Sequence, residues 1–334
     1  MTPPAEETLF LESAASVGSA GPTFDRSALR DRLARLKERN LFVGTSSWKY
    51  EGWLGMLYTP SRYSPRSRFS RTRFEAECLS EFAETFSSVC VDAGFYRFPA
   101  PDMVSRLHDQ VPEGFFFSYK VTDEITVKHF PRHARHGEKA GKPNPHFLNA
   151  DLFAAQFLSP LSPMRLKLGL IIFEFSRLYE RDFARGRDFV EALDRFLNEL
   201  PKGYRYGVEV RNATFLHPQY FATLRQHGVA HIFNEWTHMP PVAEQMQLEG
   251  SFTADFFGAR FLLTPGRAYA DAVKAFAPYD RTRDVSHSAR DAAKRLLARN
   301  TPKPSFIFVN NRLEGNALLT IASLFAKDKA EAEG

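Results

Sequence analysis

Four charged residues, Glu209, Glu174, Asp92 and Lys120, stand at or just after the ends of segments that are typical of β-strands. Two carboxylates about 5–9 Å apart can divide into a general acid and a base or nucleophile, as in glycoside hydrolysis. Arg211 would lower the pKa of Glu209, whereas an unpaired Glu174 in dry surroundings would have a raised pKa and act as the acid. The reverse assignment fits the sequence equally well. The pattern therefore predicts acid–base chemistry by carboxylates.

Other roles for the same residues stay open. Lys120 could form a Schiff base if it is desolvated, or it could anchor an anionic group. Asp92, Glu174 and Glu209 offer the hard oxygen ligands that Mg²⁺ and Mn²⁺ prefer, yet no His-Glu-x-x-His or cysteine-pair motif accompanies them. The sequence thus contains no evident motif for a cofactor, and binding of a divalent metal ion by these carboxylates is the alternative. A purely structural arrangement would pair Glu209 with Arg211 and Glu174 with Lys120.

The segment 204–211 indicates how these side chains are positioned. It alternates with a period of two, which places Tyr206, Val208 and Val210 on one face, and Glu209 and Arg211 on the other. In a closed parallel barrel, helices cover the outer face of each strand and the other strands enclose the inner face. Glu209 and Arg211 are then predicted to point inward at the carboxyl-terminal mouth.

Eight such strands are predicted, and helical patterns lie between them; the strands span 41–45, 88–92, 115–120, 168–173, 204–210, 229–234, 259–263 and 306–310. Alternating strands and helices favour an α/β protein, and eight units favour a (β/α)8 TIM barrel, a parallel eight-stranded closed sheet with outer helices. The predicted organisation is a mobile leader and capping helix (1–40), a single barrel domain (41–327) and a charged tail (328–334). A long connection, 122–149, is rich in His, Lys, Pro and Gly.

Composition narrows the class of protein. Two cysteines in 334 residues fit a reducing cytosol, and no apolar run approaches the roughly 20 residues that span a bilayer, so a cytoplasmic protein without a membrane partner is predicted. The net charge is +5. Basic residues crowd 61–73, where Tyr63, Phe69 and Phe74 are interleaved, and this pattern could meet a nucleic acid. The sequence carries no signal for the oligomeric state.

Several short segments resemble one known family in the same order. Gly44-Thr45-Ser46-Ser47-Trp48, Phe95-Tyr96-Arg97-x-Pro99, Lys120, Glu209-x-Arg211 and Asn310-Asn311 are similar to motifs of the domain-of-unknown-function 72 (YecE-like) family. The resemblance implies a TIM barrel and no established reaction. Cys90 and Asp92 depart from it, because the family usually has glutamate and asparagine there, and the segment from Arg260 lacks the family's histidine.

The combined prediction is a polar, charged pocket at the barrel mouth that takes a small polar ligand, either sugar- or phosphate-bearing. If the protein is an enzyme, a hydrolase or a lyase/isomerase with paired carboxylates fits best. A non-catalytic protein that binds a ligand or a nucleic acid through the basic aromatic loops is the alternative. The predicted ligand-binding residues are Arg211, Trp48, Tyr96, Arg97, Asn310, Asn311, Thr45 and Ser46.

Overall fold

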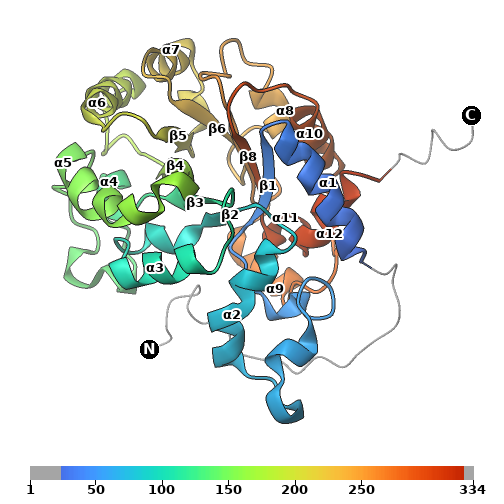
Figure 1. The fold of residues 1–334 in the computed structure, drawn as a ribbon. Helices are drawn as coiled ribbons and strands as arrows, with labels where there is room; N and C mark the ends of the chain where they lie inside the picture. Colours follow the sequence, from blue (N-terminus) through green and yellow to red (C-terminus); the bar gives the residue numbers. More distant parts are fainter. Residues whose placement is uncertain (1–23, 327–334) are drawn as a thin grey trace, which may run out of the picture.

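The computed structural model describes residues 24–326, and the chain forms a closed barrel of eight parallel strands (Figure 1). Each strand pairs with the next along the chain, and the last pairs with the first. The fold class predicted from the sequence is confirmed. The strands are β1 (Leu41–Ser46), β2 (Ser88–Val91), β3 (Phe116–Lys120), β4 (Leu168–Phe175), β5 (Arg205–Val210), β6 (Ala230–Glu235), β7 (Gly258–Phe261) and β8 (Ser305–Val309).

Helices surround the strands, and short helices interrupt the loops. The longer helices are α1 (Arg26–Glu38), α2 (Arg71–Ala83), α3 (Pro101–Asp109), α6 (Gly186–Glu199), α7 (Pro218–Gln226), α9 (Tyr269–Phe276), α10 (His287–Leu297) and α12 (Ala317–Ser323). The short ones are α4 (Asp123–Thr126), α5 (Ala150–Leu152), α8 (Val242–Gln245) and α11 (Asn311–Glu314). Within residues 24–326, none of the helices is long and apolar enough to cross a membrane.

Helix α6 shows why these segments cover the barrel. Phe189, Leu193, Phe196 and Leu197 recur at helical spacing and are all buried, so they form one apolar stripe. Their partners are the outward-facing side chains of the strands, among them Tyr206, Val208 and Val210 of β5, which belong to the same apolar cluster as the α6 stripe. The outward orientation predicted for these three residues is confirmed.

The inside of the barrel is packed and is not a channel. A second cluster of buried apolar side chains fills it, composed of Phe42, Cys90, Leu170, Ile172, Ala230, Ile232, Phe256, Phe306 and Phe308. Such layers of side chains are the usual filling of an eight-stranded barrel. Gly44 keeps β1 close to β2, because a Cβ there would lie 2.1 Å from the carbonyl oxygen of Ser88. Charged groups gather at the carboxyl-terminal mouth of the interior, and Arg205 stacks on the interior rings of Phe116 and Phe306 at the opposite end.

The long connection after β3 is tied to itself. The side-chain amide of Asn144 donates to the carbonyl oxygens of Glu124 at 2.9 Å and Val127 at 2.8 Å. Arg135 forms an ion pair with Asp123 of α4 at 2.8 Å. The segment therefore folds back over its own start, beside the mouth end of β3.

Candidate functional site

The strand ends bring the four predicted catalytic residues to one mouth. Lys120 ends β3, Glu174 lies in β4, Glu209 lies in β5, and Asp92 follows β2 directly. Glu174 and Glu209 are register partners on adjacent strands, as the strand count predicted.

Arg260 of β7 is the centre of this cluster. Its Nη1 donates to Glu174 Oε2 at 2.6 Å and to Glu209 Oε2 at 2.7 Å, and its Nη2 donates to Asp92 Oδ1 at 3.0 Å. One guanidinium thus joins the carboxylates of Glu174 in β4, Glu209 in β5 and Asp92, which follows β2. Burial opposes its charge, but Glu209, Asp92 and Glu174 raise the pKa of Arg260 well above its usual range.

Sequence reasoning did not assign Arg260 to the site, although a signal was present. In β7, Ala259 and Phe261 belong to the outer apolar layer, so Gly258 and Arg260 must face inward. An arginine at an inward position near the end of a barrel strand has to meet the charges of the mouth.

Arg211 and Lys120 surround the same carboxylates. Arg211 Nη2 lies 2.9 Å from Glu174 Oε2 and 2.5 Å from Glu209 Oε1, and Lys120 Nζ lies 3.2 Å from Glu174 Oε2. Both pairs of the structural alternative, Glu209 with Arg211 and Glu174 with Lys120, are therefore present. The guanidinium of Arg211 also stacks on Trp236, 4.1 Å from the ring centroid.

The expectation of an unpaired Glu174 with a raised pKa is wrong. Burial by itself would raise the pKa of Glu174, but Lys120, Arg211 and Arg260 outweigh it and hold that pKa well below the usual range. Glu174 Oε2 and Glu209 Oε2 contact one nitrogen at 2.6 and 2.7 Å, so these two oxygens lie within about 5 Å of each other, closer than the roughly 6.5–9.5 Å carboxyl separation of an inverting glycosidase. Glu174 is thus an ionised partner of the cations and not a store of protons at neutral pH.

Exposure falls from the edge of the mouth to its centre. Glu209 is completely buried and Arg260 is 2% exposed, whereas the side chain of Asp92 is 27% exposed. Lys120 is largely buried, and its ammonium lies 4.0 Å from the centroid of the Phe95 ring. Tyr96 is exposed at the rim, where Arg135 stacks on its ring at 4.8 Å. Among the charged residues of the cluster, Asp92 is therefore the one most open to solvent.

The ligand-binding residues predicted on β1 and after β8 are buried at the adjoining edge. Thr45 Oγ1 donates to the carbonyl oxygen of Ser47 at 2.6 Å. Asn310 Oδ1 accepts from the backbone N–H of Arg312 at 2.9 Å, and Asn311 Oδ1 accepts from that of Ala317 at 2.7 Å. These three side chains shape the backbone of the mouth.

Ser46 and Asn310 keep a donor free for the mouth. Ser46 continues the inward series of Phe42 and Gly44, and Asn310 continues that of Phe306 and Phe308, since side chains alternate along a strand. Ser46 Oγ and Asn310 Nδ2 are buried, and neither has a hydrogen-bond partner in the part of the chain that the structure describes. Trp48 is buried beyond β1, whereas Arg97 is exposed.

The arrangement of charges at the mouth also affects whether a metal ion can bind there. No group of three or more His, Cys, Asp or Glu side chains within 24–326 is arranged to hold one. At the mouth, arginine and lysine nitrogens lie against the carboxylates of Asp92, Glu174 and Glu209, so an ion would have to displace Arg260.

Comparison with known proteins identifies the family. The sequence model described as "Protein of unknown function DUF72" matches residues 42–333. The chain belongs to the DUF72 family. It is 25% identical over 182 residues to the UPF0759 protein YecE of Escherichia coli K12, covering 54% of this chain and 50% of YecE. The YecE protein of Escherichia coli O157:H7 matches equally, so the chain spans about half the length of the curated relatives it matches.

Two solved DUF72 structures share the fold. A DUF72 family protein from Enterococcus faecalis V583 superposes with a TM-score of 0.57 and 15% identity, covering 86% of this chain and 97% of that one. One from Thermotoga maritima MSB8 gives 0.56 and 17%, covering 88% and 99%. At such identities the likeness establishes the barrel alone.

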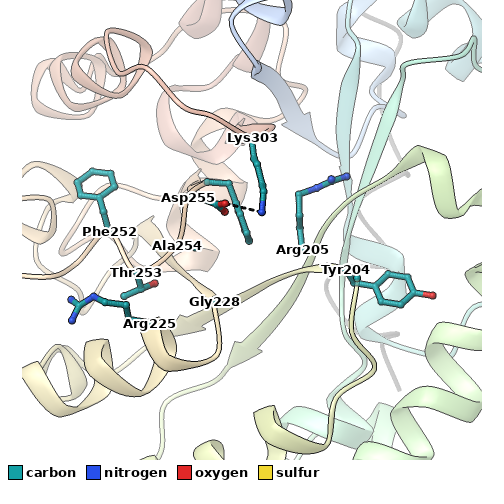
Figure 2. Close-up of a pocket in the computed structure, with 11 residues that line it drawn as sticks. Tyr204, Arg205, Arg225, Gly228, Phe252, Thr253, Ala254, Asp255 and Lys303 are labelled. Atoms are coloured by element: carbon teal, nitrogen blue, oxygen red, sulfur yellow. Dashed lines mark ion pairs between the residues drawn. The ribbon is translucent and has the colours of Figure 1, made fainter.

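This DUF72 chain also has a cleft at the other end of the barrel (Figure 2). It has a volume of about 750 Å³ and is lined by residues that start or precede strands, including Arg205 and Lys303. Lys303 is paired with Asp255 at 2.7 Å, and Arg205 stacks on Phe116 at 5.3 Å. In TIM barrels this amino-terminal face usually carries stability and the opposite face carries chemistry. The mouth is therefore the better candidate for the chemistry.

The basic segment 61–73 differs from its predicted form. The sequence left open that aromatic rings of this segment stack on the bases of a nucleic acid. Tyr63 and Phe74 are buried in the core, so these two rings are not available for that role. Arg62 is paired with Glu84 at 3.0 Å and Arg73 with Glu77 at 3.1 Å. Carboxylates of the same chain thus balance part of the positive charge.

Proposed function

We propose that the barrel mouth binds a small polar molecule and acts on it by acid–base chemistry. The observation that carries the proposal is the Arg260 cluster, in which one buried guanidinium holds three carboxylates and only one of them is open to solvent. Enclosing this many charges costs free energy unless they are paired and used. Preorganised charges in a site that excludes water stabilise the charge that develops during a reaction far more than they would in water.

The roles follow from exposure and contacts. Asp92 is the proton acceptor, because its side chain is 27% exposed and a single nitrogen of Arg260 holds one of its oxygens. Lys120, which is paired with Glu174 at 3.2 Å, supplies a positive charge behind the bound molecule. Glu174 and Glu209 are positioning residues that fix Arg260 and Arg211. Proton transfer by a positioned carboxylate serves a hydrolase as well as a lyase or isomerase.

Two narrower mechanisms receive less support. The paired-carboxylate mechanism of a glycosidase needs an acid, and the cations around Glu174 keep it ionised. A Schiff base at Lys120 needs an amine without its proton, and this amine lies 3.2 Å from a carboxylate oxygen. Lys120 is better placed as a cationic anchor.

The test is a thermal-shift screen of neutral sugars, polyols, sugar phosphates and hydroxy acids. Wild type is compared with Asp92→Asn and Lys120→Met, and Asp109→Asn is the matched control because Asp109 is exposed at the end of α3. A ligand that binds the folded state raises the melting midpoint. We expect one class to stabilise wild type and the control but not the two mouth variants. Equal shifts in all four proteins would refute a site at the mouth.

A further inference from the structure

The mouth has two unlike halves. One half is the paired cluster around Arg260, described above. The other half is the edge formed by β8 and β1, where Ser46, Asn310 and Arg312 lie at the carboxyl ends of two paired strands. This second half contains hydrogen-bond donors and no carboxylate of its own, and we refer to Ser46, Asn310 and Arg312 as the donor edge.

The amide of Asn310 has a defined orientation. Its Oδ1 accepts from the backbone N–H of Arg312 at 2.9 Å, so the other side-chain atom must be the NH₂ group. This Nδ2 is buried and has no acceptor among residues 24–326, and the same holds for the hydroxyl of Ser46. Buried donors are satisfied in nearly all proteins, so a group that the chain itself does not contain is expected to accept from them.

Arg312 adds a positive charge to this edge. It stacks on Tyr269 at 4.6 Å, and within the described part of the chain no carboxylate forms an ion pair with it. Burial opposes its charge, but Tyr269, Tyr50, Tyr279 and Asp92 raise the pKa of Arg312. Asp92 contributes to this raised pKa, but its ion pair is with Arg260.

The charge balance of the mouth also favours an anionic ligand. Asp92, Glu174 and Glu209 are matched by cations within the Arg260 cluster. Lys120, Arg211 and Arg260 already equal them in number, so Arg312 is a surplus positive charge. A partly enclosed cation without a counter-charge is costly, and an anionic group on the ligand would supply one.

We propose that the donor edge binds an oxyanion carried by the ligand, a carboxylate or a phosphate, through Arg312, Asn310 Nδ2 and Ser46 Oγ. The proposal rests on the function proposed above and defines its substrate class as small anionic molecules. The bound molecule spans the mouth, with its oxyanion at the donor edge and its reacting part beside Asp92. Charge-assisted hydrogen bonds from arginine and amide donors are the usual means of holding such groups.

The sharpest variant is Asn310→Asp. It keeps the oxygen that accepts from Arg312 N–H and replaces the free donor by a charged acceptor of the same shape. Asn149→Asp is the matched control, since Asn149 caps α5 on the exposed surface through the same kind of bond, 2.8 Å to Leu152 N–H. Ser46→Ala and Arg312→Met remove the other donors, and Arg281→Met is the control for the latter because Arg281 is exposed and paired with Asp280.

The probes are inorganic phosphate, acetate, and the matched pair of glycerol and glycerol 3-phosphate, titrated by calorimetry at low salt. For at least one of the three anions, we expect binding to wild type and to both control variants. Binding should weaken by about tenfold or more in Asn310→Asp and Arg312→Met, and less in Ser46→Ala. A tungstate soak of wild-type crystals gives a position for the anion that does not depend on any variant. Density at the donor edge supports the proposal.

The outcomes separate the two proposals. Glycerol bound as tightly as glycerol 3-phosphate, with Asp92→Asn abolishing both, would keep the site at the mouth and overturn the donor edge. Anion binding that survives Asn310→Asp, or tungstate in the cleft around Arg205 and Lys303, would overturn it too. Absence of binding by all three anions to wild type would likewise overturn it, and the wider screen with Asp92→Asn would still decide the proposed function.

Discussion

At the scale of single residues, the charge network around Arg260 explains which parts of the mouth can change. Glu209 and Arg260 are almost fully buried, and each is held by the other. A buried ion pair contributes little net stability as a pair, but removal of one partner strands the other charge in the interior. Asp92 sits at the edge of the same network and can lose its charge at a smaller cost.

Arg260→Met should therefore destabilise the barrel strongly. It keeps most of the side-chain volume and leaves Glu174 and Glu209 with fewer cations, so we expect a loss of about 3–5 kcal/mol in the free energy of unfolding. Urea denaturation followed by far-UV circular dichroism measures it. Arg281→Met, on the exposed surface, should change the same quantity by no more than about 0.5 kcal/mol. A loss below about 1 kcal/mol in Arg260→Met would show that the cluster is not central to stability.

At the scale of elements, the connection after β3 is held by the carboxylate of Asp123, whose burial disfavours its ionised form. Asp123 of α4 is 5% exposed and forms its ion pair with Arg135, which also stacks on Phe95. Burial raises the pKa of Asp123 from 3.8 to about 6, although Arg135 works in the opposite direction. The carboxylate thus ties the long connection to the mouth while its ionised form weakens the folded state.

The pH dependence of the free energy of unfolding should show that ionised Asp123 destabilises the folded chain. The pKa of Asp123 is higher in the folded chain than in the unfolded one. Below the unfolded pKa of 3.8, Asp123 is protonated in both states and does not lower the free energy of unfolding. Its stability penalty is complete above the folded value of about 6. Asp123→Asn removes this penalty, so its free energy of unfolding relative to wild type should rise by on the order of 2 kcal/mol between about pH 4 and pH 7. Urea denaturation at several pH values measures the difference.

A suitable comparison is Asp109→Asn, whose carboxylate is exposed at the end of α3. Its difference from wild type should stay nearly constant over the same pH range. If the difference in free energy of unfolding between Asp123→Asn and wild type is equally flat, or falls with rising pH, the ionised carboxylate of Asp123 does not destabilise the folded chain.

At the scale of the whole molecule, closure of the barrel makes the first and last strands depend on each other. β8 pairs with β1 along five residues and with β7 along four, and α12 packs beside both β1 and β8 (Figure 1). Loss of β8 exposes two strand edges and the rings of Phe306 and Phe308, which fill the interior. Ser46 and Asn310 of the donor edge stand at the ends of the two strands that this closure joins.

A chain ended after Asn300 lacks β8, α11 and α12, and it should fail to form the native barrel. We expect loss of most of the far-UV signal of the native fold, or association into soluble aggregates, as seen by circular dichroism and size-exclusion chromatography. A chain ended after Ala326 keeps every strand and helix named above and should retain the wild-type spectrum. A compact monomer with a cooperative melt from the shorter chain would show that closure is dispensable.

Local patterns in the sequence were sufficient to predict the fold and to bring several charged residues to the barrel mouth. Strand and helix periodicities gave the eight units, and the alternation along β5 placed Glu209 and Arg211 inside the mouth. These properties depend on neighbours a few residues away, so they can be read from one segment at a time. The expected pairs of Glu209 with Arg211 and Glu174 with Lys120 followed from the same reasoning. Expectations for the leader before residue 24 and the tail after residue 326 lie outside the described residues.

Only the tertiary structure decided how these charges act on one another. Arg260 lies 168 positions from Asp92 and 86 from Glu174 in the sequence, yet it contacts both. The burial of Tyr63 likewise depends on α2, whose Glu81 accepts its hydroxyl at 2.6 Å. A pKa depends on charges within a few ångströms and on exclusion of water, and both are properties of the assembled barrel. The sequence therefore determined which groups reach the mouth, and the packing of eight strands determined which are paired, which are buried and which remain free to bind.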